Sequence, residues 1–114
     1  MAGKLTTHVL DTELGHAGAG MRIELFRRAP TPERLLSAAL DRDGRATLLE
    51  GAALRPGIYE IVFHVGAYHR EHGASAAAPF LDEVPVRFRI VDAEAQYHVP
   101  LVMSRYGYTT YRGS

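Results

Sequence analysis

The sequence predicts an all-β fold, an antiparallel β-sandwich, and three observations lead to it. Apolar and polar residues alternate with period two, most regularly over residues 86–90, where arginines separate the apolar positions. Short segments of this kind recur along the chain. Clusters of Gly, Pro or Asp separate them, at residues 15–20, 55–57 and 92–93. Many short strands at such spacing are typical of a sandwich.

Each predicted strand is a short run of β-branched, aromatic or alternating residues. The strands are expected over residues 5–10, 21–27, 46–49, 58–65, 86–90, 96–103 and 106–111. No internal repeat or second domain is visible, and a chain of 114 residues fits one domain, residues 1–114.

Two segments do not fit the strand pattern. Residues 31–40 begin with Thr31 as a possible N-cap and Pro32 at the first helical position, so local propensity predicts a helix. Residues 67–73 have the length and the closing Gly73 of a short helix, and the alanine-rich residues 74–78 are expected to form a surface loop.

The charge balance excludes several classes of partner. Thirteen basic and thirteen acidic side chains give a formal net charge of zero, so no electrostatic footprint for nucleic acid or an anionic membrane exists. A small-molecule partner fits better. Cysteine is absent, which excludes disulfides, thiolate catalysis and thiolate metal ligation. No apolar run has the length of a signal peptide or a membrane span, so the expected compartment is the cytoplasm.

Two histidines are candidates for chemistry. His8 and His98 each lie inside a predicted strand, where solubility alone does not place an imidazole. An imidazole in a partly dry cleft can be neutral near pH 7 and take a proton from water. The alternative is a core histidine bonded to a backbone carbonyl, and the strand pattern alone favours that alternative.

Arg45 follows Asp43 and Gly44, a pair typical of a tight turn, and opens a predicted strand. A guanidinium there can hold a carbonyl or a developing oxyanion, although a solvated surface charge is the simpler interpretation. His64, His69 and His72 lie close in sequence, but their spacing matches no zinc motif, and no metal site is expected.

The C-terminal residues are predicted to form part of a site. A phenol, a guanidinium and a hydroxyl gather in Tyr111, Arg112 and Ser114, and the strand predicted before them would carry the terminus to a fixed place.

Four motifs together resemble the hydroxyisourate hydrolase family, the transthyretin-like enzymes of purine breakdown. The motifs are Leu5-Thr6-Thr7-His8-Val9-Leu10-Asp11-Thr12, Asp43-Gly44-Arg45, Tyr97-His98-Val99-Pro100-Leu101 and Tyr111-Arg112-Gly113-Ser114. The resemblance spans nearly the whole chain. It implies a prealbumin-type, Greek-key sandwich of two four-stranded sheets with a short helix after the fifth strand. It also implies that residues 31–40 form a strand, against their propensity.

For function, the resemblance implies hydrolysis of the cyclic amide of 5-hydroxyisourate to 2-oxo-4-hydroxy-4-carboxy-5-ureidoimidazoline, without a metal or cofactor. It assigns His8, His98 and Arg45 to catalysis, and His8, Arg45, Tyr111, Arg112 and Ser114 to substrate binding. It further implies a homotetramer, a dimer of dimers, with active sites in a channel between subunits.

The chain departs from the family's pattern in three places. Gln96 stands where a second histidine is common, Arg105 follows Ser104 in place of proline, and the turn at residues 15–18 lacks proline. Two alternatives to the enzyme stay open. One is a carrier that binds small aromatic ligands in the same kind of intersubunit channel without turnover, and the other is a structural immunoglobulin-like sandwich.

Overall fold

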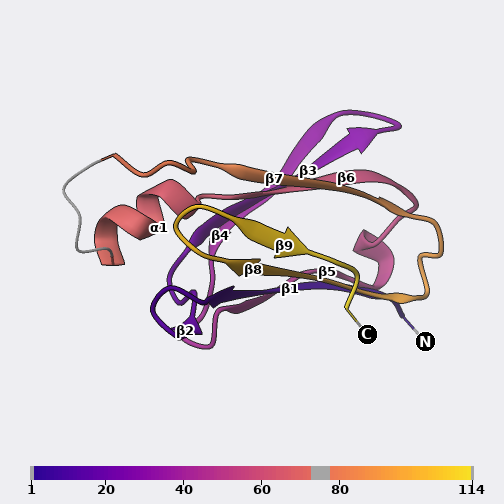
Figure 1. The fold of residues 1–114 in the computed structure, drawn as a ribbon. Coiled ribbons are helices and arrows are strands. Elements are labelled where there is room, and N and C mark those ends of the chain that lie inside the picture. The colour runs from indigo at the N-terminus through magenta and orange to yellow at the C-terminus, as the bar shows by residue number, and fades with distance from the viewer. Residues whose placement is uncertain (1, 73–77, 114) are drawn as a thin grey trace.

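The computed structural model describes residues 2–72 and 78–113, whose strands form two layers (Figure 1). The first sheet consists of β1 (Lys4–Asp11), β2 (His16–Ala17), β5 (Arg45–Glu50), β8 (Gln96–Met103) and β9 (Tyr108–Thr110). The second consists of β3 (Arg22–Ala29), β4 (Glu33–Ala39), β6 (Gly57–Phe63) and β7 (Val84–Ile90), in the order β4-β3-β6-β7. A 3₁₀ turn, η1 (Gly51–Ala53), precedes β6.

The pairing of β1 organises the first sheet. Its whole length pairs with β8, its first half pairs with β5 on the other edge, and its last two residues pair with β2. β9 extends the sheet beyond β8. The predicted sandwich is confirmed, with two refinements: the short β2 adds a fifth strand to the first sheet, and the pair β1 and β8 is parallel, while all other pairs are antiparallel.

The helix prediction that local propensity gives for residues 31–40 is wrong. Residues Glu33–Ala39 form β4, as the family resemblance implies, and this strand pairs antiparallel with β3 from Arg22 to Arg27. Thr31 and Pro32 lie in the hairpin turn instead of capping a helix. A ladder with a neighbouring strand outweighs a weak local preference, because it satisfies the backbone groups along the segment.

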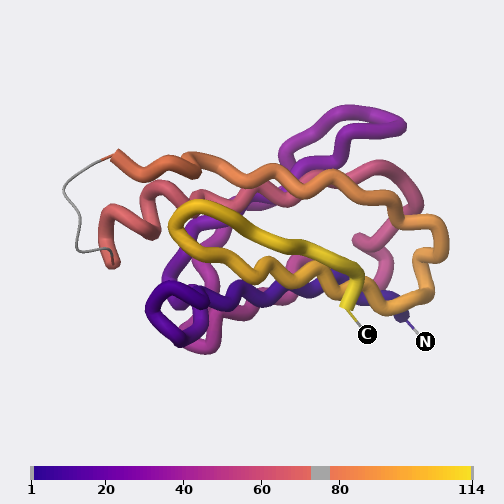
Figure 2. Tube along the Cα trace, viewed as in Figure 1, coloured from indigo at the N-terminus to yellow at the C-terminus, as the bar shows by residue number. Residues whose placement is uncertain are grey.

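One α-helix, α1 (Val65–His72), covers one end of the sandwich and confirms the short helix predicted near residues 67–73. Gly73 and most of the loop predicted over 74–78 lie outside the described residues. The Tyr68 hydroxyl donates a hydrogen bond of 2.9 Å to the buried carboxylate of Asp11, which ties α1 to the end of β1. No described helix is long and apolar enough to cross a bilayer. The first and last described residues lie at the end of the sandwich opposite α1 (Figure 2).

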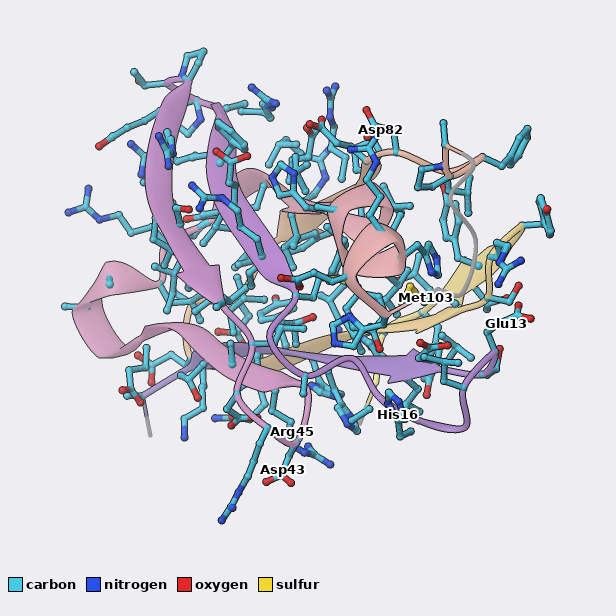
Figure 3. The ribbon with its side chains drawn as sticks, turned by 90° about the vertical axis from the view of Figure 1, so that its left-hand side faces the viewer. Glu13, His16, Asp43, Arg45, Asp82 and Met103 are labelled. Carbon is cyan, nitrogen blue, oxygen red and sulfur yellow. The ribbon has the colours of Figure 1, made fainter. Side chains whose placement is uncertain are left out.

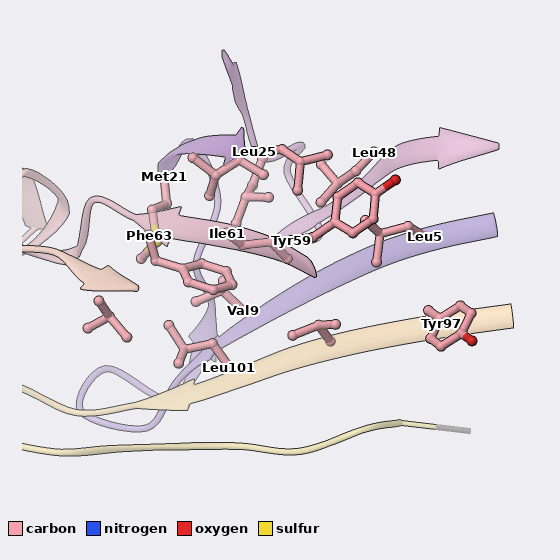
Figure 4. Close-up of a cluster of buried hydrophobic side chains, with 14 of the residues drawn as sticks. Leu5, Val9, Met21, Leu25, Leu48, Tyr59, Ile61, Phe63, Tyr97 and Leu101 are labelled. Carbon is pink, nitrogen blue, oxygen red and sulfur yellow. The ribbon is translucent and has the colours of Figure 1, made fainter. Parts of the chain in front are cut away.

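The core forms between the two sheets, where alternate residues of each strand point inward. Figure 4 shows Val9 of β1 and Leu101 of β8 near Ile61 and Phe63 of β6, while Leu5 lies farther along β1. All five side chains are fully buried. Because side chains of a strand alternate between faces, the neighbours of these residues must point to the outer face of the first sheet. The core therefore determines which residues of β1 and β8 are available for a site.

The outer face of the second sheet carries paired charges. The Glu60 carboxylate accepts hydrogen bonds from Arg28 at 2.8 Å and Arg87 at 2.9 Å. Glu24 accepts one from His64 at 2.8 Å and lies 3.3 Å from the Arg34 guanidinium. These pairs tie β3, β4, β6 and β7 together across the sheet.

Candidate active site

The strand register brings the predicted catalytic residues to one surface, the outer face of the first sheet. His8 of β1 is paired with Arg45 of β5, and Thr6 of β1 is paired with both Thr47 of β5 and His98 of β8. The two rows are neighbours, because Thr6 and His8 are two positions apart on one face of β1. In Figure 3, Arg45 and Asp43 lie on the side of the molecule away from the β3–β4 hairpin.

A cavity of about 550 Å³ opens on this face. Its walls come from three strands, the turn before β5 and the C-terminal segment, and most of the lining residues have polar side chains. The lining includes Thr6, Asp41, Arg45, Thr47, Gln96, His98 and Gly113. His8 does not line the cavity itself, but it lies two residues along β1 from Thr6 and is paired with Arg45, which does. The cavity is large enough for a small heterocycle.

Both candidate histidines are half-buried and lie on the outer face, so neither is a core histidine. The His98 ring is oriented by a hydrogen bond of 2.8 Å between its Nδ1 and the Thr6 hydroxyl. Burial lowers the pKa of His98, and the positive charges of Arg45 and His8 lower it further, while a hydrogen bond with Thr6 acts in the opposite direction. A neutral imidazole able to accept a proton is therefore favoured near pH 7.

Arg45 is exposed and lines the cavity, on the side of β1 opposite His98. Arg45 and His98 therefore flank the same hollow from two different strands. Fixed positive charge beside a neutral base is the combination that activates water and stabilises a developing oxyanion.

The C-terminal segment divides between two places. The Gly113 amide donates a hydrogen bond of 2.7 Å to the His98 carbonyl, and a Cβ atom at Gly113 would lie only 2.5 Å from Cδ2 of the His98 ring. Glycine thus allows the segment to lie against the imidazole. Tyr111 and Arg112 line a separate apolar cavity of about 310 Å³ beside β7 and β8, where Arg112 lies over the Tyr97 ring. Ser114 lies outside the described residues.

Several polar residues of this cavity carry no role in the sequence-based prediction, among them Thr6, Asp41, Thr47 and Gln96. Thr6 was detectable in principle, because it precedes His8 by two positions and must share its face. Asp41 and Thr47 become visible only with the register of β1 and β5.

Three of the four other histidines have hydrogen-bond or stacking partners, whereas the buried Nε2 of His69 has no hydrogen-bond partner among the described residues. His64 bonds Glu24, and Nδ1 of the exposed His16 bonds the carbonyl of Ala17. His72 stacks on Tyr68 in α1. No group of three His, Cys, Asp or Glu residues in the described part of the chain is placed to hold a metal ion.

Comparison with known proteins identifies the family of the chain. The sequence profile of the HIUase/Transthyretin family matches residues 5–113. The chain belongs to this family. Every residue that lines the outer-face cavity lies within the matched range.

The family contains close relatives of the chain. The chain is 49% identical over 117 residues to 5-hydroxyisourate hydrolase 2 of Rhizobium meliloti (strain 1021), and the match covers 99% of this chain and 98% of that protein. A crystal structure of (S)-allantoin synthase superposes with a TM-score of 0.94 at 38% identity, and the chain spans 44% of its length. The structure of Klebsiella pneumoniae 5-hydroxyisourate hydrolase gives 0.83 at 28% identity, covering 98% of this chain and 99% of that one. By this relationship the chain is a hydrolase.

Proposed function

We propose that the chain hydrolyses 5-hydroxyisourate to 2-oxo-4-hydroxy-4-carboxy-5-ureidoimidazoline. The observation that carries the proposal is the convergence of His8, Arg45 and His98, from three strands, beside one open polar cavity. The 49% identity to a 5-hydroxyisourate hydrolase over nearly the whole chain supports this substrate.

In the proposed reaction, water attacks the carbonyl carbon of the cyclic amide. One imidazole, His98 or His8, takes a proton from the water as the new C–O bond forms, and the other orients it. The C–N bond of the tetrahedral intermediate then breaks. The ring nitrogen leaves with the proton returned by the imidazole, and the carbonyl becomes the product's carboxylate. One water is consumed, and no metal or cofactor is required.

Arg45 supplies the second requirement of the reaction, positive charge for the oxyanion. Its guanidinium keeps its charge at every relevant pH and presents several donors in one plane. Removing one positioned oxyanion donor typically costs about 3 kcal/mol of transition-state stabilisation. Tyr111, Arg112 and Ser114 are proposed as substrate-binding residues on the family resemblance, although Tyr111 and Arg112 line the separate apolar cavity beside β7 and β8.

We also propose that the active particle is a homotetramer, a dimer of dimers, whose channel encloses the cavity. Three tyrosines on and beside β9 support an interface there: Tyr106 is 69% exposed, Tyr108 44% and Tyr111 56%. Large apolar rings exposed along one edge are typical of a surface that a partner covers. Light scattering tests this, and a monomer at working concentration contradicts it.

The function is tested with substrate generated in place from urate by urate oxidase. We expect the purified chain to accelerate the loss of hydroxyisourate absorbance in the ultraviolet far above the spontaneous rate. A carrier, the alternative, would bind the compound and leave the rate unchanged. The guanidinium of Arg45 and the half-buried imidazole of His98, which line one cavity, favour hydrolysis over binding without turnover.

A further inference from the structure

We propose that Asp41 is a positioning residue that holds Arg45 in its place beside His8. This inference rests on the proposed function, because it assigns Arg45 to the oxyanion. Asp41 is exposed and lies on the wall of the outer-face cavity, four residues before Arg45. Its carboxylate bonds backbone amides, so Asp41 would act on the reaction through Arg45.

The Asp41 carboxylate closes the turn that leads into β5. One oxygen, Oδ1, accepts hydrogen bonds from the backbone amides of Asp43 and Arg45, both at 2.9 Å. The backbones of Asp41 and Arg45 are also joined directly, because the Asp41 amide donates a hydrogen bond of 3.0 Å to the Arg45 carbonyl. The Arg45 backbone is thereby held through both its amide and its carbonyl by a single residue.

The charge state of Asp41 suits this role. The amide of Arg45 is the strongest influence that lowers the pKa of the Asp41 carboxyl, against the opposing effect of burial, and the charges of Arg45 and His8 act in the same direction. The carboxylate is therefore ionised at neutral pH, and a charged acceptor makes stronger hydrogen bonds to backbone amides than a neutral one.

A second anchor fixes the same turn against β1. The Val9 amide donates a hydrogen bond of 2.8 Å to the Gly44 carbonyl. Gly44 has φ of +71°, and a Cβ atom there would lie 2.7 Å from the Val9 carbonyl oxygen. Val9 follows His8 and Gly44 precedes Arg45, so this contact and the Asp41 carboxylate together determine the distance between His8 and Arg45.

The test compares Asp41→Ala, which removes the acceptor, with Asp41→Asn, which keeps an acceptor oxygen and removes the charge. We expect Asp41→Ala to lower kcat about tenfold with less change in KM. This loss is smaller than the roughly hundredfold decrease in rate that misplacement of a catalytic group can cause. Asp41→Asn should stay within about twofold of wild type, because its amide oxygen can accept both bonds. Arg42→Ala, an exposed position in the same turn, is the matched control and should leave both constants unchanged.

A double-mutant cycle separates positioning from general damage to the fold. If Asp41 acts through Arg45, adding Asp41→Ala to Arg45→Ala costs nothing further, whereas independent effects multiply. The proposal is overturned if Asp41→Ala equals wild type, if Asp41→Asn is as impaired as Asp41→Ala, or if the tenfold loss persists in the Arg45→Ala background.

One readout does not depend on the reaction. The Arg45 amide should exchange with solvent at least about tenfold faster in Asp41→Ala than in wild type or Asp41→Asn, because its acceptor is gone. Unchanged exchange overturns the positioning role. A wild-type chain that does not accelerate hydrolysis overturns the proposed function instead, and the exchange measurement then still decides whether Asp41 holds Arg45.

Discussion

The outer faces of the two sheets carry similar side chains in different arrangements. On the second sheet, carboxylates and cations neutralise one another: Glu60 lies between Arg28 and Arg87, and His64 bonds Glu24. The hydrogen bond from Arg28 is the main cause that lowers the pKa of Glu60, and that from His64 lowers the pKa of Glu24. These charges neutralise one another, and their hydrogen bonds link the four strands of the second sheet.

On the first sheet, among the described residues, no carboxylate forms an ion pair with His8, Arg45 or His98. His98 bonds the neutral hydroxyl of Thr6, and Asp41, which lines the same cavity, directs its carboxylate to backbone amides. The positive charge of Arg45 therefore remains available to a ligand, and it helps to lower the pKa of His98. The difference between the faces teaches that pairing, more than residue type, separates structural charges from functional ones.

The largest expected effect tests the imidazole on the first sheet. His98→Asn keeps a polar side chain of moderate size but cannot act as a base, so kcat should fall about 10²- to 10⁴-fold. The rate is followed by ultraviolet absorbance on freshly generated hydroxyisourate, with a thermal melt to show that the fold persists. A variant near wild-type activity removes His98 from the mechanism.

A matched pair of arginines sharpens the contrast. Arg45→Ala should lower kcat about 100-fold, since an oxyanion donor is lost, with little change in unfolding free energy. Arg87→Ala should do the opposite: kcat is unchanged, and stability falls by about 0.5–1 kcal/mol, because Arg87 is 64% exposed and its ion pair is screened. Chemical denaturation measures the second quantity. If both variants lower kcat equally, the proposed difference in function between the two outer faces is contradicted.

The pH dependence tests the charge environment of His98. Because its pKa is lowered, the neutral base persists below the usual histidine value of about 6.5, and kcat/KM should fall only at lower pH. The same shift makes the contribution of His98 to stability complete above about pH 6.5 and lost as the pH falls toward its folded-state pKa.

Arg45→Ala removes one cause of this shift, so the acidic limb of kcat/KM should move to higher pH, while Arg87→Ala leaves it in place. An acidic limb above pH of about 6.5 in wild type contradicts the assignment of His98 as the titrating base.

The smallest expected effect concerns the hydroxyl that orients His98. Thr6→Val removes the hydrogen bond to Nδ1 and should lower kcat about fivefold, corresponding to ~1 kcal/mol. Thr6→Ser keeps the hydroxyl and is the control. If the two variants have the same kcat, the hydroxyl does not orient the ring.

The sequence allowed the strands to be predicted because alternation reflects burial on one face, which holds for residues 86–90 and for β8. It failed at residues 31–40, since propensity does not include the partner strand β3. His8, Arg45 and His98 could be identified separately, and the family resemblance grouped them. Thr6 remained without a role because its contact with His98 depends on the register between β1 and β8, which no local pattern specifies. The contacts of Asp41 are local, but only the register of β1 with β5 shows that its turn lies beside His8.

The parallel pairing of β1 with β8 has a consequence for how the molecule folds. Thr6 and His98 are 92 residues apart in sequence, and every contact between these two strands closes a loop of similar length. Contacts of such high sequence separation form late, because a long stretch of chain must be ordered before they become favourable. The imidazole thus meets its hydroxyl only when nearly the entire polypeptide has been synthesised and collapsed, so enzymatic turnover after dilution from denaturant should recover no earlier than the pairing of β1 with β8.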